Sequence, residues 1–230
     1  MTSQGGAGGG GGLRGTWSST PAPVMKVDGR VLLCSVADLP RDLPVGIPGR
    51  SGTTEETAFV IVDESDAPSD DTHARRGSPI RPNDADAPSD DAALGESGDP
   101  ISSRVLRVRL PAGKRGQHVF LHDALPRTTS FASTHLSLGR AICVASGGDA
   151  GVGVALVLLQ LFFDDAGKPR SALGGDVAVS KNSVRTRLEW IIASRPQTNP
   201  SRAILKRVNE FLLSTHSRHG DAEFGPTVQL

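Results

Sequence analysis

The sequence predicts an α/β sandwich, in which helices pack against the faces of a sheet. Two observations indicate this fold class. Between residues 104 and 163 the chain reads as strand, helix, strand, glycine-rich loop and apolar helix. The apolar residues also change their spacing, from every second residue at 106–110 to helical spacing at 184–192 and 204–212. This mixture of periods is what a sheet enclosed by helices requires.

Four short apolar segments are predicted to be strands because each is bounded by residues that break regular structure. In the third of them, apolar residues alternate with Arg107 and Arg109, as expected of a strand with one buried face. The four segments are residues 31–36, 58–64, 106–110 and 140–145.

Two helices are predicted in the middle of the chain. The first is expected to begin near Pro126. Its apolar positions would be Leu125, Thr129, Ala132 and Leu136. His118 and His122 precede it and flank a strand-like segment, so we expect a structural role for both. The second helix, from about Val152 to residue 163, is apolar nearly all round, which is typical of a buried helix.

Two more helices are predicted near the C-terminal end. The third helix has apolar residues at helical spacing and ends before Pro196. Those residues are Val184, Leu188, Ile191 and Ile192. The fourth is expected to have Asn199 as its N-cap and Pro200 at its first position, where the missing N–H costs nothing. Its apolar face would consist of Ile204, Leu205, Val208, Phe211 and Leu212.

Composition divides the chain into parts that fold and parts that do not. Residues 1–25 are rich in glycine and serine and are predicted to be a disordered tail. Residues 65–100 are predicted to be a disordered acidic insertion, because they are polar and repeat the tract DAPSDD. The remaining predicted parts are the first strands at 26–64, the main α/β domain at 101–216 and a tail at 217–230.

Several classes of protein are disfavoured by simple counts. No run approaches the roughly 18 apolar residues of a membrane span, and the glycine-rich start lacks the apolar core of a signal peptide. We therefore expect a soluble protein with no membrane partner. The two cysteines, Cys34 and Cys143, are far apart in sequence and are expected to be reduced thiols in an intracellular setting.

The most distinctive local feature is the glycine-rich stretch CVASGGDAGVGV at residues 143–154. Where a strand ends and a helix begins, backbone N–H groups converge at the positive end of the helix dipole and can bind an anion. The predicted phosphate-binding loop consists of Ser146, Gly147, Gly148, Ala150 and Gly151. A tight turn without a ligand fits the same residues equally well.

A cysteine phosphatase would need an arginine six residues after its nucleophile. Counted from Cys143, that position is Asp149, whose carboxylate would repel a phosphate and raise the pKa of the thiol. Phosphatase catalysis is therefore disfavoured, and a buried small residue at a strand end is the simpler interpretation of Cys143.

Charge is unevenly distributed although the net charge is zero. Residues 63–99 contain eleven acids and three arginines, so this segment should repel nucleic acid. Residues 181–207 contain seven basic residues and one acid, Glu189. Clusters of this kind bind RNA phosphates. The predicted RNA-binding residues are Arg185, Arg187, Arg195, Arg202, Lys206 and Arg207.

Three blocks of sequence resemble the C-terminal domain of the fungal initiator tRNA ribosylphosphate transferases. They are LPAGKRGQHVFLHDALPRTTSF, GGDAGVGVALVLLQLFFDD and VRTRLEWIIASRPQTNPSRAILKRVNEFLL. The resemblance covers about residues 105–213, and its most specific part is the NPSR…LKRVNEFLL block. It implies a three-layer α/β sandwich similar to dual-specificity phosphatases. In the family a larger N-terminal domain precedes this one, whereas this sequence starts with glycines.

The resemblance also implies an activity. The family transfers ribosyl phosphate from phosphoribosyl pyrophosphate to a ribose 2′-OH of initiator methionyl tRNA, in the cytoplasm. The implied partners are the initiator tRNA and phosphoribosyl pyrophosphate, and the pyrophosphate donor implies Mg²⁺. A non-catalytic module of the same fold that only binds tRNA or a phosphate group is the alternative.

Two residues in the glycine-rich stretch are the catalytic candidates, Asp149 and Cys143. Asp149 would bind Mg²⁺ or orient the hydroxyl, or it would simply stabilise the start of a helix as an N-terminal acid. The family's loop runs roughly Cys-x-x-Gly-x-Asp-x-Ser-Val-Gly, often with Lys before Asp. The positions of the family's Cys, Lys and Ser are occupied in this sequence by Val144, Gly148 and Gly151. Cys143 lies one residue before the position of the family's Cys.

Overall fold

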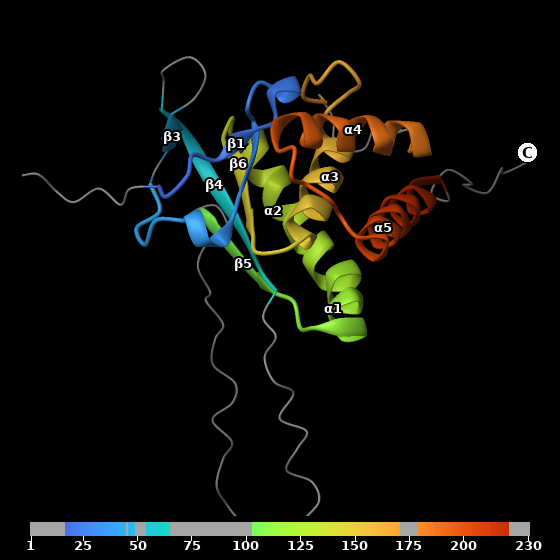
Figure 1. Cartoon of the computed structure of the whole chain (residues 1–230). Coiled ribbons are helices and arrows are strands. Elements are labelled where there is room, and N and C mark those ends of the chain that lie inside the picture. The colour runs from blue at the N-terminus through green and yellow to red at the C-terminus, as the bar shows by residue number, and fades with distance from the viewer. Residues whose placement is uncertain (1–16, 45, 49–53, 65–102, 171–178, 221–230) are drawn as a thin grey trace, which may run out of the picture.

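The structure is a computed structural model that describes residues 17–44, 46–48, 54–64, 103–170 and 179–220 (Figure 1). The helices gather on one side of a twisted sheet (Figure 1). The predicted α/β fold class is confirmed. The predicted acidic insertion, residues 65–100, lies outside the described residues.

Among the described residues the sheet has six strands, four of them parallel to one another. In spatial order the parallel strands are β2 (Val31–Cys34), β6 (Ala141–Ser146), β4 (Thr54–Asp63) and β5 (Val105–Arg109). Two short antiparallel strands complete the sheet, β1 (Ala22–Pro23) beside β2 and β3 (Gly46–Pro48) beside β4. The carboxyl ends of the parallel strands therefore meet at one edge of the sheet, where α/β proteins commonly bind their ligands.

The described residues form five α-helices; the last four lie in the chain order predicted from the sequence, and the first was not predicted. They are α1 (Gly113–Val119), α2 (Leu125–Ser137), α3 (Ala150–Phe162), α4 (Lys181–Ser194) and α5 (Arg202–Gly220). A π-helical turn, Phe120–Ala124, joins α1 to α2 without a break. Two single 3-10 turns, η1 (Met25–Val27) and η2 (Val36–Asp38), lie near the N-terminal strands.

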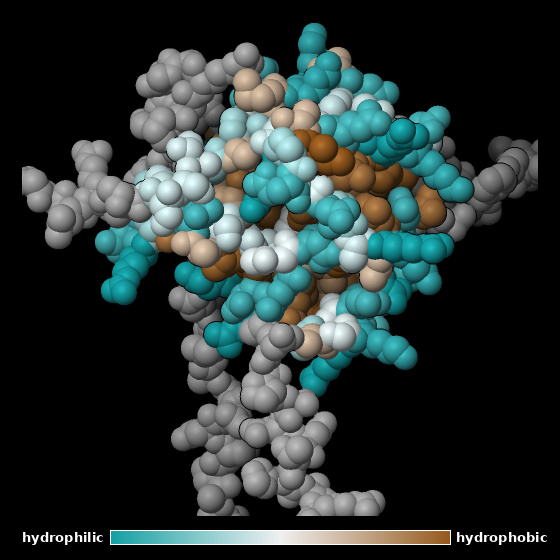
Figure 2. All heavy atoms as spheres, in the orientation of Figure 1, coloured by the Kyte–Doolittle hydropathy of each residue, from teal (hydrophilic) through white to brown (hydrophobic). Residues whose placement is uncertain are grey.

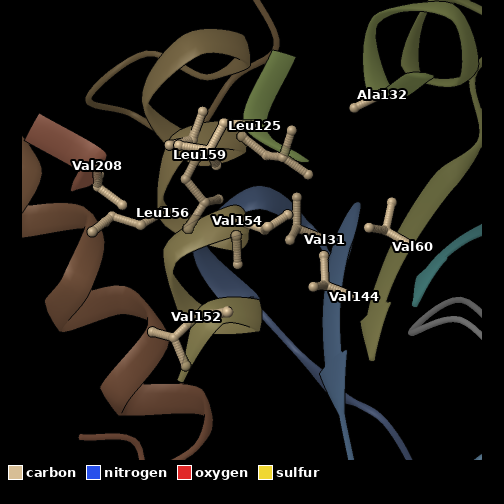
Figure 3. Packing of buried hydrophobic residues seen from close by; sticks show 14 of the residues in the cluster. Val31, Val60, Leu125, Ala132, Val144, Val152, Val154, Leu156, Leu159 and Val208 are labelled. Atoms are coloured by element: carbon tan, nitrogen blue, oxygen red, sulfur yellow. The ribbon is translucent and has the colours of Figure 1, made fainter. Parts of the chain in front are cut away.

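Helix α3 is the centre of the main core. Twelve of its thirteen residues are buried, and its side chains fill the space between the sheet and α5 (Figure 3). Val152 and Leu156 lie toward Val208 of α5, whereas Val154 lies toward the strands (Figure 3). An apolar helix of this kind is stable in water only when other elements enclose it.

The opposite face of the sheet carries a smaller apolar cluster. Phe59, Ile61 and Cys143 belong to it, and Trp17 stacks on Phe59 with ring centroids 6.3 Å apart. Side chains from residues 36–43 complete this thin outer layer. The predicted disordered tail at 1–25 is therefore too long, because residues 17–25 contribute Trp17, β1 and the start of η1 to the fold.

Helix α2 begins at Leu125, close to the predicted start near Pro126, but the strand-like segment expected before it is wrong. Residues 113–124 are helical, so His118 and His122 are exposed helical residues whose rings lie 4.4 Å apart, and they do not flank a strand. One predicted helix start is wrong. The N-cap of α5 is Ser201 rather than Asn199, since the Ser201 Oγ accepts a hydrogen bond from the Ile204 N–H at 3.3 Å.

The surface seen in Figure 2 is mostly hydrophilic, with apolar atoms gathered over α4 and α5. Ile192 of α4 and Leu213 of α5 are among the exposed large apolar side chains. None of the helices in the described ranges combines the length and apolar character that crossing a bilayer would require.

Gly153 allows α3 and α5 to approach closely. A Cβ added there would lie 2.6 Å from Ile204 Cγ2 and 2.9 Å from Phe120 Cζ. We therefore expect Gly153→Ala to destabilise the protein by about 1 kcal/mol, because overpacking exceeds the gain in helix propensity. Gly147→Ala is the control, since a Cβ at Gly147 meets no atom within 4 Å. Urea unfolding measures both variants, and equal stabilities would contradict this account of the packing.

Candidate functional site

The glycine loop connects the end of β6 to the start of α3. Ser146 is the last residue of β6, Gly147–Asp149 form the turn, and Ala150 is the first residue of α3. Glu64 directly follows β4, the neighbouring parallel strand, so it reaches the same edge of the sheet. The loop therefore lies where the predicted strand-to-helix transition placed it.

A hydrogen-bond network between Ser146 and Glu64 fixes the loop. The Ser146 hydroxyl donates to Glu64 Oε1 at 2.9 Å and accepts from the N–H groups of Gly148 and Gly151 at 3.1 and 3.3 Å. Glu64 Oε1 also accepts from the Ala150 N–H at 3.2 Å. Three backbone donors at the start of α3 thus bind the protein's own side chains.

This network changes the interpretation of the predicted phosphate-binding loop. Ser146, Gly147, Gly148, Ala150 and Gly151 do lie together, as predicted, but the N–H groups of the last three already have acceptors. Only the Ala150 N–H donates to an anion, the Glu64 carboxylate, whereas the Gly148 and Gly151 N–H groups donate to the Ser146 hydroxyl. Gly148 has to be glycine in this arrangement, because a Cβ there would collide with that carboxylate.

Asp149 links the starts of two helices. Its Oδ2 accepts a hydrogen bond of 2.7 Å from the Ser201 N–H, next to the first residue of α5, and its carbonyl oxygen accepts from Val152 and Gly153 in α3. The alternative interpretation of Asp149, an acid that stabilises helix starts, agrees with these contacts. Its predicted roles in catalysis and Mg²⁺ binding stay predictions.

The described residues contain no preformed metal site. No group of three or more His, Cys, Asp or Glu side chains lies close enough together to hold an ion there. Asp149 and Glu64 each use one carboxylate oxygen within the protein. Mg²⁺ therefore finds no complete set of ligands among the residues described, although substrate phosphates and water commonly supply most of its ligands.

A pocket of about 490 Å³ opens beside the loop, between α1 and the start of α5. Its walls are largely apolar or glycine, and its polar side chains are Glu64, Gln117, Asp149 and Ser201. None of the lining residues that the structure describes is basic. The other lining residues are Leu110, Pro111, Ala112, Gly113, Gly116, Phe120, Gly147, Gly148, Ala150, Ala203 and Ile204.

Cys143 is not part of this site. It lies within β6 rather than at the strand end, and its side chain belongs to the cluster on the opposite face of the sheet. Its Sγ lies 3.6 Å from Cys34 Sγ. The hydrogen bond to Cys34 and burial raise the pKa of Cys143, so the thiol stays protonated. The prediction that Cys143 is catalytic is therefore wrong at this site.

The six predicted RNA-binding residues do not form one exposed surface. Arg187 is fully buried in α4, where Nη1 pairs with Asp165 Oδ1 at 2.6 Å and Nη2 donates to the Phe163 carbonyl at 3.3 Å. Its guanidinium also lies over the ring of Trp190, 4.9 Å from the centroid. The prediction that Arg187 contacts RNA is wrong, because the side chain is part of the core.

The other five basic residues remain at or near the surface. On α4, Arg185 is exposed and pairs with Glu189. On α5, Arg202 and Lys206 are exposed, and Arg202 follows the pocket residue Ser201. Arg207 is half-buried beside Glu210, and Arg195 is half-buried in a small pocket with Cys34. Of these, Arg202 is the residue nearest in sequence to the candidate site.

Glu64 is the residue of the candidate site that the sequence interpretation missed. It counts among the eleven acids of residues 63–99 and is the last residue of the predicted strand 58–64, and in the structure it directly follows β4. Polar residues that follow parallel strands collect at the carboxyl edge of the sheet, and this rule was the available signal. Gln117 and Ser201 carried no comparable signal.

Residues 104–212 match the family model Init_tRNA_PT, described as the Rit1 DUSP-like domain. These residues resemble a Rit1 DUSP-like domain. The predicted resemblance over about 105–213 is thereby confirmed, and it associates the domain with a tRNA-modification family. The loop, the pocket residues from Leu110 onward and α5 as far as Leu212 lie within the matched range; Glu64 lies outside it.

Solved structures of dual-specificity phosphatases also match this chain, at low sequence identity. A human DUSP28 variant is 11% identical, with 87% of this chain and 99% of that chain covered and a TM-score of 0.43. A mouse putative dual-specificity phosphatase complexed with zinc tungstate is 11% identical, with 90% and 96% covered and a TM-score of 0.43. A leucine-rich repeat and phosphatase domain protein from Entamoeba histolytica is 8% identical, with 86% and 94% covered and a TM-score of 0.44. No curated protein matched the chain.

The burial of Arg187 can be tested against its neighbour Arg185 on the same helix. Arg187→Ala should lower the free energy of unfolding by about 3 kcal/mol, because it leaves a cavity and removes the partner of Asp165. Arg185→Ala should leave the urea midpoint unchanged, because Arg185 and its partner Glu189 are exposed. Equal effects of the two variants on the midpoint would contradict the buried position.

The thiol pair predicts a pH-dependent reactivity. The hydrogen bond from Cys143 lowers the pKa of Cys34 despite its burial. Alkylation of Cys34 by iodoacetamide should therefore reach half its maximal rate at a lower pH than an ordinary thiol, and Cys143 should react last. In Cys143→Ala the donor is lost, so the midpoint for Cys34 should move to higher pH. Mass spectrometry after a pH series of alkylation measures this midpoint, and an unchanged value would refute the hydrogen bond.

Proposed function

We propose that the chain acts in the addition of ribosyl phosphate to a ribose 2′-OH of initiator methionyl tRNA, with phosphoribosyl pyrophosphate as the donor. The observation that supports this proposal most directly is the match of residues 104–212 to the Rit1 DUSP-like domain. Mg²⁺ would enter with the pyrophosphate group of the donor, since the described residues provide no metal cluster of their own.

The chemistry of this transfer does not require a protein nucleophile. The 2′-OH oxygen bonds to the anomeric carbon of the donor, the bond from that carbon to pyrophosphate breaks, and the hydroxyl proton passes to water or to the departing pyrophosphate. The protein has to align the two reactants and stabilise the charge that develops. A site with no cysteine in its loop is compatible with this reaction, whereas a cysteine phosphatase mechanism is not.

The RNA would be held by exposed basic residues near the pocket. Arg202 and Lys206 are exposed on α5, whose first turn contributes Ala203 and Ile204 to the pocket wall. Basic residues at such a position would neutralise RNA phosphates while a nucleoside of the same RNA reaches the pocket. Three further residues stay candidates for RNA binding although they do not line the pocket: Arg185, which is exposed, and Arg195 and Arg207, which are half-buried.

A non-catalytic module that only binds tRNA is the second candidate. One observation favours it: the loop amides bind Ser146 and Glu64 rather than standing free for a donor phosphate. In this case the domain would hold the RNA, and the transfer would take place on another domain or protein.

Both candidates are tested by incubating the chain with initiator tRNA, Mg²⁺ and phosphoribosyl pyrophosphate labelled in its 5′-phosphate. Label in the tRNA would support the transferase. Salt-sensitive tRNA binding without label would support the binding module. Elongator methionyl tRNA is the control for specificity. If the tRNA carries no label and also does not bind the chain at low salt, both proposals are overturned.

The contribution of Arg202 gives a quantitative prediction. Arg202→Ala should weaken tRNA binding several-fold and reduce the slope of log affinity against log salt by about one, because one phosphate contact is lost. Arg185→Ala, on α4 away from the pocket, is the matched control and should change the slope less. A filter-binding series between low and moderate salt measures the slope for the unaltered protein and for each variant. Identical slopes for these three proteins would argue against a phosphate contact at Arg202.

A further inference from the structure

The polar groups of the pocket beside the glycine loop are unusual for a phosphate site. Two of them are carboxylates, Glu64 and Asp149, and no basic residue lines the pocket within the described part of the chain. A phosphate bound here would face like charge at short range, which is unfavourable even at the surface of a protein. The pocket is therefore better suited to a neutral ligand that donates hydrogen bonds.

The Glu64 carboxylate is held in a fixed orientation. Its Oε1 accepts hydrogen bonds from the Ser146 hydroxyl and the Ala150 N–H, at 2.9 and 3.2 Å. Its Oε2 lies against Gly148 and has no hydrogen-bond donor among the described residues. One oxygen thus positions the group, and the other is an acceptor available to a ligand in the pocket.

The remaining walls suit a flat, partly apolar group. Leu110, Phe120 and Ile204 line the pocket together with glycine backbone, and the volume of about 490 Å³ lies in the usual range for small-molecule sites. A nucleoside combines a flat base with ribose hydroxyls that donate hydrogen bonds and carries no charge itself. It matches both the walls and the carboxylate.

We propose that this pocket binds one nucleoside, with Glu64 Oε2 accepting a hydrogen bond from a ribose hydroxyl. The proposal rests on the proposed function in one respect, since a nucleoside of the bound RNA is the natural occupant. It assigns Glu64 as a residue that positions the sugar. The glycine loop then serves to hold Glu64, rather than to bind the phosphate of a substrate.

Titration of the full 230-residue chain with adenosine, followed by amide NMR signals, tests the proposal. Adenosine should shift the signals of Gly148 and Ala150 saturably. 2′,3′-Dideoxyadenosine should bind about tenfold more weakly, because it lacks the donors to Glu64. Glu64→Gln should weaken adenosine binding about tenfold and abolish the difference between the two nucleosides. Absence of saturable shifts with adenosine would overturn the proposal.

Two further variants make the result specific. Glu189→Gln removes the same charge from an exposed position on α4 outside the pocket, and should bind both nucleosides as the unaltered protein does. Gly148→Ala should act like Glu64→Gln, because the added Cβ displaces the Glu64 carboxylate. The dispersion of the amide spectrum verifies that each variant is folded.

Binding of inorganic phosphate tests the alternative to this proposal, in which the Glu64 carboxylate occupies a site that otherwise binds an anion. If phosphate binds Glu64→Gln more tightly than the unaltered protein while adenosine binding is unchanged, the carboxylate is a substitute for phosphate and the proposal fails. The proposed function is separable from this result. If Glu64→Gln leaves the transfer to tRNA and the binding of tRNA unchanged, only the nucleoside site is overturned. If the chain binds adenosine but does not bind tRNA, only the proposed function is overturned.

Discussion

The enclosure of α3 is the constraint on which the rest of the structure depends. Because its residues are apolar on every side, the helix must be covered by the sheet on one side and by other helices on the rest (Figure 3). Its position fixes where the turn at Gly147–Asp149 emerges from β6. Asp149 then holds the start of α5 through the Ser201 N–H, so burial of α3 positions both the loop and the α5 wall of the pocket.

Features with a short-range physical cause could be predicted from the sequence. The four parallel strands, the buried helix and the loop between β6 and α3 each follow from apolar runs or glycines within one segment. Glu64 could not be placed in the same way, since its contact with Ser146 joins residues 82 positions apart. The π-helical turn also escaped prediction, because no single residue type in Phe120–Ala124 specifies it.

Arg187 shows how a residue type can mislead when its position is ignored. It follows Val184 by three residues and precedes Ile191 by four, so helical spacing puts it on the same buried stripe as those two. Because the prediction grouped Arg187 with other basic residues by charge, it wrongly placed Arg187 on the surface. The fold accepts the charge because Asp165, the Phe163 carbonyl and the ring of Trp190 surround the guanidinium.

The π-helical turn at Phe120–Ala124 sets the rotation of α1 relative to α2. One residue corresponds to about 100° of helical rotation. Upstream of the turn, Gly116 and Gln117 face the pocket, while downstream Thr128, Ala132 and His135 are buried. A deletion of a single codon within the turn would swing the pocket-facing side of α1 away while α2 kept its packing. The shape of the pocket wall is thus tied to the length of this segment more tightly than to the identity of its side chains.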